Sequence, residues 1–236
     1  MLIQQQPTYI LHARPWRETS LLLECLTRDL GCVGVIARGA RRPRARNSQS
    51  DLQPFQELAV DFSLRGELGT LRTVEVVQRP LTLKGTALLA GLYVNELVVR
   101  MSGRQDPHSG LYDIYRQAVQ RLASGSVVAW ALRRFERDFL DAVGYAMELR
   151  YVADSRTALD AETDYLYLPE QGPVPTNASA GLVVRGSDLL ALAADCMPDA
   201  DGMQRLRRLS RGLLLHHLGG VPLRSWQVLS SAARRG

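Results

Sequence analysis

The stretch SLLLECLTRDLGCVGVIARGARRPRAR, residues 20–46, contains two apolar runs followed by a loop dense in arginine. Ser20–Leu26 and Cys32–Ala37 are strand-like, and Asp29–Gly31 makes a tight connection between them. Gly39 and Pro43 disfavour a regular helix or strand in the loop. Its five arginines fall within nine residues, with no acid between them: Arg38, Arg41, Arg42, Arg44 and Arg46.

This arginine loop, residues 37–50, is predicted to contact phosphate. Like charges packed so closely repel one another, and a polyanion would relieve the repulsion. Arginine suits that role because its planar guanidinium grips phosphate and stacks on bases. The alternative is a solvated loop without a partner, as many basic runs are.

Outward from this stretch, three further strands are predicted at Tyr9–His12, Glu57–Phe62 and Thr70–Val77. Five short strands in about seventy residues indicate a small sandwich or barrel, and the five-stranded oligonucleotide-binding (OB) barrel has this count. In such barrels the loops joining strands one to two and four to five flank the ligand. These loops carry the candidate nucleic-acid contacts Arg14, Trp16, Arg17 and Arg65. The indole of Trp16 would stack on a base; alternatively, it caps the core behind Pro15.

From Pro80 onward the hydrophobic period becomes helical. Apolar stripes run through 88–99, 111–122 and 128–143, and a further helix contains Leu206, Leu209 and Leu213. Short strand-like pieces near 165–168 and 182–184 predict a hairpin at about 163–185. We therefore predict an α+β protein of two domains: an OB-fold nucleic-acid-binding domain at 1–79 and a mainly α-helical domain at 80–236.

A second basic cluster lies on the last long helix. Its arginines straddle the leucine stripe, and a border of cations around an apolar groove suits an acidic peptide with hydrophobic anchors. The residues predicted to receive such a peptide are Arg205, Leu206, Arg208, Leu209 and Arg211, with Arg133 and Arg134 on an earlier helix. For Arg137, next to Asp138, a solvated face with local ion pairs is the simpler interpretation.

Composition narrows the class of protein. The net charge of +5 and pI of about 9.4 permit a nucleic acid or an anionic surface as partner. Three cysteines without a Cys-x-x-Cys spacing argue against a disulfide framework or a zinc site, and indicate a reducing cytoplasm. No signal peptide is visible, and the apolar stretch 87–99 is too short and too polar to span a bilayer.

The sequence lacks the motifs of phosphate-binding loops, zinc-dependent hydrolases and serine hydrolases. We therefore predict a protein that is not an enzyme. Asp160, Glu162 and Asp164 resemble the start of a calcium loop, but its required glycine and final glutamate are replaced. His216 and His217 are adjacent on a helix and point about 100° apart, so they make a poor metal pair. No metal and no cofactor are therefore expected.

Eight short segments, in order along nearly the whole chain, form one further pattern: Leu11–Ser20, Ala37–Arg41, Leu52–Phe55, Arg65–Leu68, Gly91–Leu97, Ala131–Glu136, His217–Gly220 and Leu223–Ser225. Together they resemble the RecO family of bacterial DNA repair proteins. The resemblance implies an OB domain followed by a helical domain. It also implies binding of single- and double-stranded DNA, annealing of complementary strands, and, with RecR, loading of RecA on DNA coated by single-strand binding protein (SSB).

The same resemblance implies that the acidic, Phe-ended tail of SSB docks on the helical domain. Many relatives carry a four-cysteine zinc module in the carboxy-terminal half, whereas residues 150–184 contain no cysteine, so this chain resembles the zinc-free form. Such a protein would act in the cytoplasm on the nucleoid, without a membrane partner. Two other functions stay open: an RNA-binding OB protein, and a metal-dependent nuclease using Asp160, Glu162 and Asp164.

Overall fold

The computed structural model describes residues 1–43, 45, 47–78, 80–176 and 181–233. They form two compact units. The first, called here the barrel unit, is Met1–Ser124 with Leu223–Gly236, and the second, the helical unit, is Gly125–Pro222. Whether residues 1–79 fold as a domain by themselves stays a prediction.

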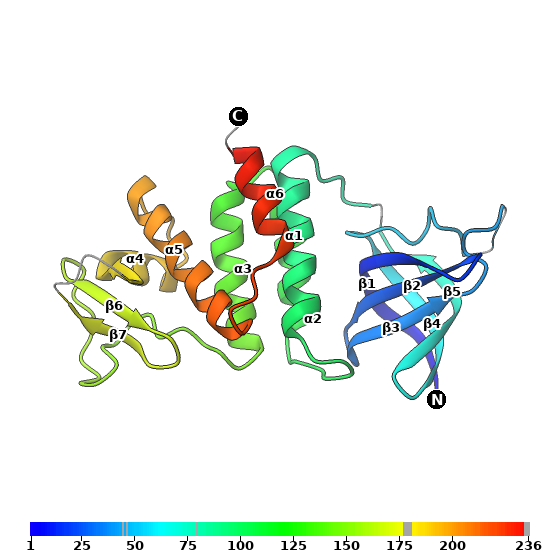
Figure 1. Cartoon of the computed structure of the whole chain (residues 1–236), viewed down its shortest axis with the longest axis horizontal. Coiled ribbons are helices and arrows are strands. Elements are labelled where there is room, and N and C mark those ends of the chain that lie inside the picture. The colour runs from blue at the N-terminus through cyan, green and yellow to red at the C-terminus, as the bar shows by residue number, and fades with distance from the viewer. Residues whose placement is uncertain (44, 46, 79, 177–180, 234–236) are drawn as a thin grey trace. The chain divides into compact units, whose positions relative to one another are not determined.

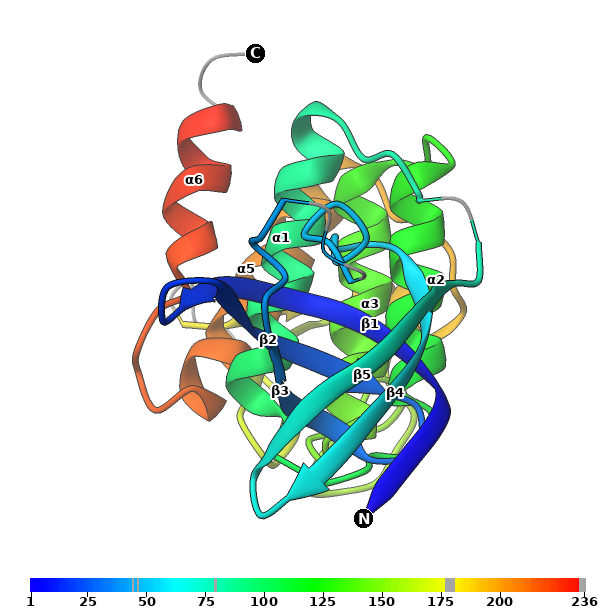
Figure 2. The ribbon, with the colours of Figure 1, turned by 90° about the vertical axis from the view of Figure 1, so that its right-hand side faces the viewer.

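The barrel is formed by β1 (Leu2–Trp16), β2 (Ser20–Thr27), β3 (Gly31–Ala37), β4 (Glu57–Arg65) and β5 (Leu68–Val76). It closes in the order β1-β2-β3-β5-β4, with β3 and β5 parallel and the other pairs antiparallel (Figure 2). Alternate side chains fill its interior; Leu23, Val35, Leu58 and Phe62 are each at most 1% exposed. The predicted α+β class and the five-stranded OB-type barrel are confirmed.

Strand β1 is longer than the sequence pattern predicted, because it is bent twice. Register shifts occur between Ile3 and Gln6 and between Ile10 and His12. The first half of β1 pairs with β4 and the second half with β2, so these bulges let one strand close the barrel. Trp16 therefore ends a strand, and the β1–β2 turn is only residues 17–19.

Three helices belong to the barrel unit: α1 (Gly85–Met101), α2 (Leu111–Ala123) and α6 (Arg224–Ala233). Figure 1 shows α6 alongside α1, although about 120 residues separate them in sequence. Tyr9 on the outside of β1 packs against Tyr112 and Tyr115 of α2, with ring centroids 5.2 and 4.9 Å away. At Tyr9 the outer surface of β1 is thus covered by aromatic side chains of α2.

The helical unit contains α3 (Val128–Ala142), α4 (Gly186–Ala193) and α5 (Ala200–His217), with the strands β6 (Asp164–Leu168), β7 (Gly172–Pro175) and β8 (Val183–Arg185). The predicted hairpin is a three-stranded sheet of order β7-β6-β8. Sequence reasoning missed β7 because it contains Pro173 and Pro175. Both are tolerated there, since β7 is an edge strand.

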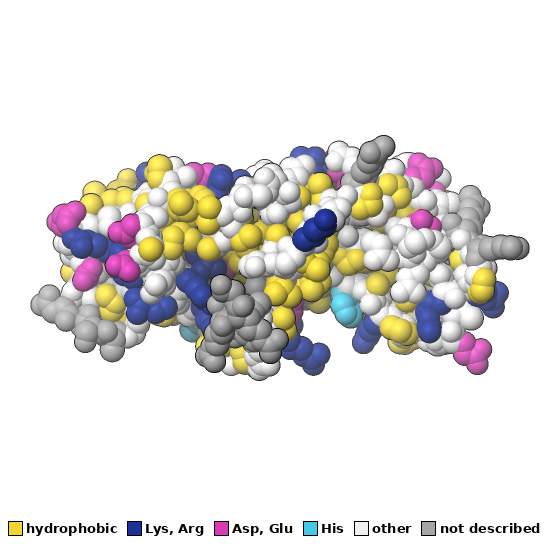
Figure 3. Space-filling model, turned by 90° about the horizontal axis from the view of Figure 1, so that it is seen from above, with side chains coloured by type: hydrophobic (Ala, Val, Ile, Leu, Met, Phe, Trp, Pro, Cys, Tyr) yellow, Lys and Arg dark blue, Asp and Glu magenta, His cyan; other side chains and the backbone are white. Residues whose placement is uncertain are grey.

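None of the helices in the described residues is long and apolar enough to cross a membrane. On the face shown in Figure 3, charged side chains are interspersed with the hydrophobic ones.

Candidate nucleic-acid interface

The base of the arginine loop is fixed to the barrel. Ala40 and Leu52 are each 2% exposed and belong to the barrel core. Gly39, with a φ of +69°, accepts a backbone hydrogen bond from Arg42 at 2.9 Å, and Gln49 donates to the Ala40 carbonyl at 3.1 Å. The described part of this loop is therefore an ordered platform rather than a free tail.

The loop also contacts two other parts of the barrel. The backbone N–H of Arg41 donates to the Thr19 carbonyl at 3.0 Å, and its guanidinium lies 3.4 Å from the Glu18 carbonyl. Further along, the side-chain amide of Asn47 donates to the Arg72 carbonyl of β5 at 3.0 Å. The arginine loop thus extends from the β1–β2 turn to β5 at one end of the barrel.

Exposed arginines without an acidic partner gather at this end. Those of the arginine loop are Arg38, Arg41 and Arg42, and those of β1 and its turn are Arg14 and Arg17. Within the described ranges, no carboxylate lies within ion-pairing distance of any of the five. Arg44 and Arg46, also predicted to contact phosphate, lie outside the described residues.

Two more side chains, Trp16 and Arg72, are candidates for this surface. Trp16 is half-buried at the end of β1, opposite Ser20, which is compatible with both base stacking and capping the core. Arg72 is exposed on β5 next to buried Leu71, and sequence reasoning missed it. The alternation of apolar and polar residues along this strand could have revealed it, because Arg72 falls on the polar side.

Arg65 does not join this cluster. It ends β4 opposite Leu68 of β5, and Leu68 lies beside Gly34 of β3. Gly34 precedes Ala37, where the arginine loop begins, by three residues, or roughly 10 Å along a strand. Of the predicted basic loops, the arginine loop and the β1–β2 turn are therefore brought together, and the β4–β5 turn is not.

Arg104 was not predicted and occupies the outer face of the barrel. Its guanidinium binds both carboxylate oxygens of Glu24 on β2, at 2.8 and 3.0 Å. Gly34 permits this approach, because a Cβ there would lie 2.6 Å from the Arg104 guanidinium. Arg104 is therefore held by an acidic partner on the outer face of the barrel, unlike the described arginines of the arginine loop.

In the helical unit, the predicted peptide-binding residues of α5 divide into two groups. Leu206 and Leu209 are at most 1% exposed and form part of the packed interior. Arg205 binds Asp188 of α4 through Nε at 2.6 Å and Nη2 at 3.2 Å, and Asp188 is only 2% exposed. Arg208 and Arg211 lie on the exposed surface.

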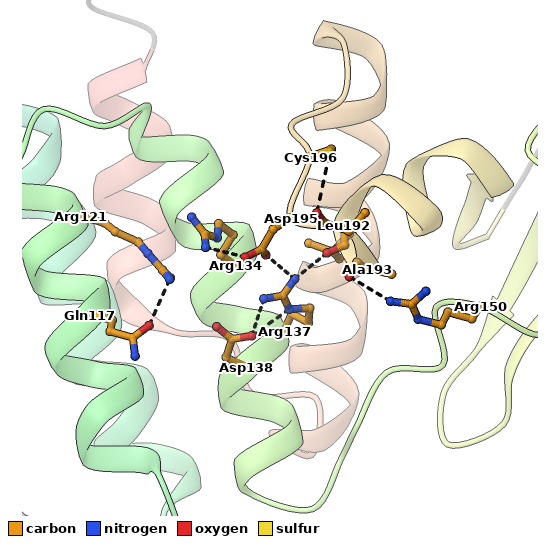
Figure 4. Close-up of polar contacts among 11 residues, drawn as sticks. Gln117, Arg121, Arg134, Arg137, Asp138, Arg150, Leu192, Ala193, Asp195 and Cys196 are labelled. Atoms are coloured by element: carbon orange, nitrogen blue, oxygen red, sulfur yellow. Dashed lines mark hydrogen bonds and ion pairs between the residues drawn. The ribbon is translucent and has the colours of Figure 1, made fainter.

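The arginines of α3 are bound within the helical unit. Arg133 is 7% exposed and pairs with Glu136 at 2.5 Å. Arg134 and Arg137 both bind Asp195, each at 2.6 Å, and Arg137 also donates to the Leu192 carbonyl (Figure 4). The interpretation of Arg137 as a member of local ion pairs is confirmed. Arg134 pairs with the same carboxylate, that of Asp195.

Of the three acids considered for metal-dependent cleavage, Asp160 and Glu162 stabilise the turn before β6, and Asp164 begins that strand. Asp160 accepts hydrogen bonds from the Glu162 N–H at 2.9 Å and the Thr163 hydroxyl at 3.3 Å, and Glu162 pairs with Arg185. Among the cysteines, Cys25 and Cys32 are buried on β2 and β3. Burial raises the pKa of Cys32 to about 12 and that of Cys25 further, so both stay protonated thiols.

A closed five-stranded barrel of the OB type, followed by helices and a small sheet, defines an α+β protein with an OB-fold amino-terminal part. The family model "Recombination protein O N terminal" matches residues 1–80, and "Recombination protein O C terminal" matches residues 83–227. The chain belongs to the RecO family of DNA repair proteins. It is 45% identical over 240 residues to the DNA repair protein RecO of Xanthomonas euvesicatoria, with both chains fully covered. It is 41% identical to that of Xylella fastidiosa, covering 98% of this chain and 97% of that one.

Proposed function

We propose that this chain is a recombination mediator that binds single- and double-stranded DNA through one end of its barrel. The observation that carries the proposal is the described part of the arginine loop, which is fixed to the barrel and whose Arg38, Arg41 and Arg42 are exposed without an acidic partner in the described residues. Arg17 lies on the β1–β2 turn that this loop contacts. A phosphate backbone supplies the negative charge that the cluster lacks.

The proposed activities follow from sequence-independent binding. Neutralising the charge of two complementary strands removes the repulsion between them, so a protein with this surface would anneal them. By membership of the RecO family, the chain would act with RecR to load RecA on SSB-coated DNA, in the cytoplasm and on the nucleoid. Annealing of complementary oligonucleotides with and without SSB tests this activity, and a preference for RNA would favour an RNA-binding function instead.

The salt dependence of binding tests the arginine loop itself. If Arg38, Arg41 and Arg42 each neutralise one phosphate of a single strand, they contribute about −2 to the slope of log affinity against log salt. With Arg44 and Arg46 the contribution would be about −3.5. The double variant Arg41→Ala, Arg42→Ala should flatten the slope by about 1.4, measured by anisotropy of a labelled oligonucleotide.

The matched control removes two exposed arginines of the helical unit, Arg156 and Arg207, and should leave the slope unchanged. An unchanged slope in the Arg41, Arg42 variant would show that the loop is solvated without a role in binding. Equal flattening in both variants would show that only net charge matters and that the barrel end is not the site.

We also propose that the acidic SSB tail binds the helical unit through exposed arginines of α5. Because Leu206 and Leu209 are buried and Arg205 is held by Asp188, the proposal rests on charge complementarity with Arg208 and Arg211.

A further inference from the structure

Three potential metal ligands meet in the helical unit. Glu170 lies in the turn between β6 and β7, and His216 and His217 are the last two residues of α5. One carboxylate oxygen of Glu170 and one ring nitrogen of each histidine all lie within 4.8 Å of one another. His216 Nε2 lies 3.2 Å from Glu170 Oε1.

The place where these side chains meet explains why two adjacent histidines can work together. Their Cα–Cβ bonds diverge by about 100° on α5, but the side chains are long enough for both rings to reach Glu170, and beyond the helix Gly219 and Gly220 turn the chain with positive φ. The two rings are 5.2 Å apart and nearly perpendicular. The third ligand comes from the β6–β7 turn, which sequence spacing could not place beside them.

The surroundings of the cluster favour a cation. The carbonyl groups at the carboxy-terminal end of a helix carry partial negative charge, and Glu170 adds a full one. The ring of His217 stacks on Tyr145 at 4.0 Å, which restricts its orientation.

We propose that Glu170, His216 and His217 bind a transition-metal dication, with Zn²⁺ as the natural occupant and water as the fourth ligand. Nitrogen and carboxylate ligands at this count suit zinc. Bond lengths of about 2.1 Å place tetrahedral ligand atoms about 3.4 Å apart. The three ligand atoms now lie within 4.8 Å of one another. Rotation of the exposed Glu170 and His216 side chains brings them to the distances that a bound ion requires.

A bound ion would tie the β6–β7 turn to the end of α5. Because the ligands come from residues 170 and 216–217, the unfolded chain does not hold them together, and binding stabilises the folded state. The site is separate from the arginine loop, so DNA binding needs no metal under this proposal.

The test titrates Zn²⁺ into the untagged full-length protein at neutral pH by calorimetry. We expect one ion per chain and a rise in the thermal unfolding midpoint. Glu170→Gln and His216→Ala, both at exposed positions, should each weaken binding at least about tenfold and abolish the rise. The Glu170→Gln, His216→Ala, His217→Ala triple variant should not bind.

His108 provides the matched control, because it lies 3.6 Å from Asp106 but has no second histidine nearby among the described residues. His108→Ala should bind Zn²⁺ like the parent. Visible absorption of bound Co²⁺ reports the coordination number and should show a four-coordinate ion in the parent and in His108→Ala, but not in the triple variant. The proposal is overturned if the parent binds no Zn²⁺, or if the triple variant binds it with the parent's affinity.

Discussion

The side-chain amide of Asn95 donates a hydrogen bond of 2.9 Å to the backbone carbonyl of Leu11, which ties helix α1 to strand β1. Tyr115 of α2 donates its hydroxyl to the Asn95 carbonyl oxygen at 2.8 Å. Asn95 is 3% exposed and Tyr115 is fully buried. One amide therefore satisfies two buried polar groups from two other elements of the barrel unit.

Replacing Asn95 with Leu should lower the free energy of unfolding by roughly 2–5 kcal/mol, because the Leu11 carbonyl and the Tyr115 hydroxyl lose their partner. Tyr115→Phe should cost less, about 1–2 kcal/mol, since only the Asn95 oxygen is left without its donor. Urea unfolding measures both. The control Gln120→Ala, at an exposed position of α2, should stay within about 0.5 kcal/mol of the parent. An equally small effect of Asn95→Leu would contradict the structural role of this amide.

Glu96 should make the free energy of unfolding of the barrel unit depend on pH. Its two carboxylate oxygens accept the backbone N–H groups of Arg224 and Ser225, both at 2.8 Å, at the beginning of α6. Burial opposes ionisation, but the hydrogen bonds from Ser225 and Arg224 and the charge of Arg100 outweigh it and lower the pKa of Glu96. The stabilisation is therefore present above the ordinary Glu pKa of about 4.3 and is lost as the pH falls through the lower folded value.

Glu96→Gln tests this dependence. At neutral pH the parent should be more stable than the variant by about 1 kcal/mol. The difference is this small because Glu96 is only half-buried, so solvent screens its charge. The difference should shrink as the pH falls below about 4.3, because the parent carboxyl then becomes neutral. Denaturant unfolding across a pH series gives both values. A difference that stays constant down to acidic pH would rule out a role for the charge.

Alanine substitutions at Gly31 and Gly66 should distinguish the cost of backbone strain from the cost of a steric clash. Their φ values are nearly equal, at +64° and +61°. A Cβ on Gly31 would lie 2.3 Å from the Asp106 carbonyl oxygen, whereas one on Gly66 would meet nothing within 4 Å. We expect Gly66→Ala to cost about 1–2 kcal/mol, and Gly31→Ala to cost clearly more because the backbone must also move. Equal losses in thermal or urea unfolding would mean that the loop at Asp106 adjusts freely.

Arg208→Glu should weaken binding of an acidic peptide ending in Phe at least about tenfold, or roughly 1.4 kcal/mol. Fluorescence anisotropy of a labelled SSB-tail peptide measures the affinity. Arg205 is a poor choice for this test, because its loss leaves the buried Asp188 unpaired and destabilises the helical unit. Arg156→Glu, at an exposed position elsewhere in the helical unit, is the matched control. Unchanged affinity in Arg208→Glu would place the peptide elsewhere.

Local patterns in the sequence predicted the elements themselves. Strand alternation and glycine turns are properties of neighbouring residues, so the barrel strands could be recognised without a structure. The same holds for the leucine stripe of α5 and for the density of charge in the arginine loop. The sequence pattern did not predict the edge strand β7, because proline is uncommon in strands and β7 contains two.

The sequence by itself determined the kinds of elements, their order and the surplus of arginine, because these depend on residues close together in the chain. Only the tertiary structure decided which arginines meet an acid: among the described residues Arg41 has no acidic partner, whereas Arg205 is bound by Asp188, 17 residues away. It also decided that Asn95 joins Leu11, 84 residues away, and that Glu170 meets His216. Partners so far apart in sequence are selected by packing of the whole chain, which no local pattern records.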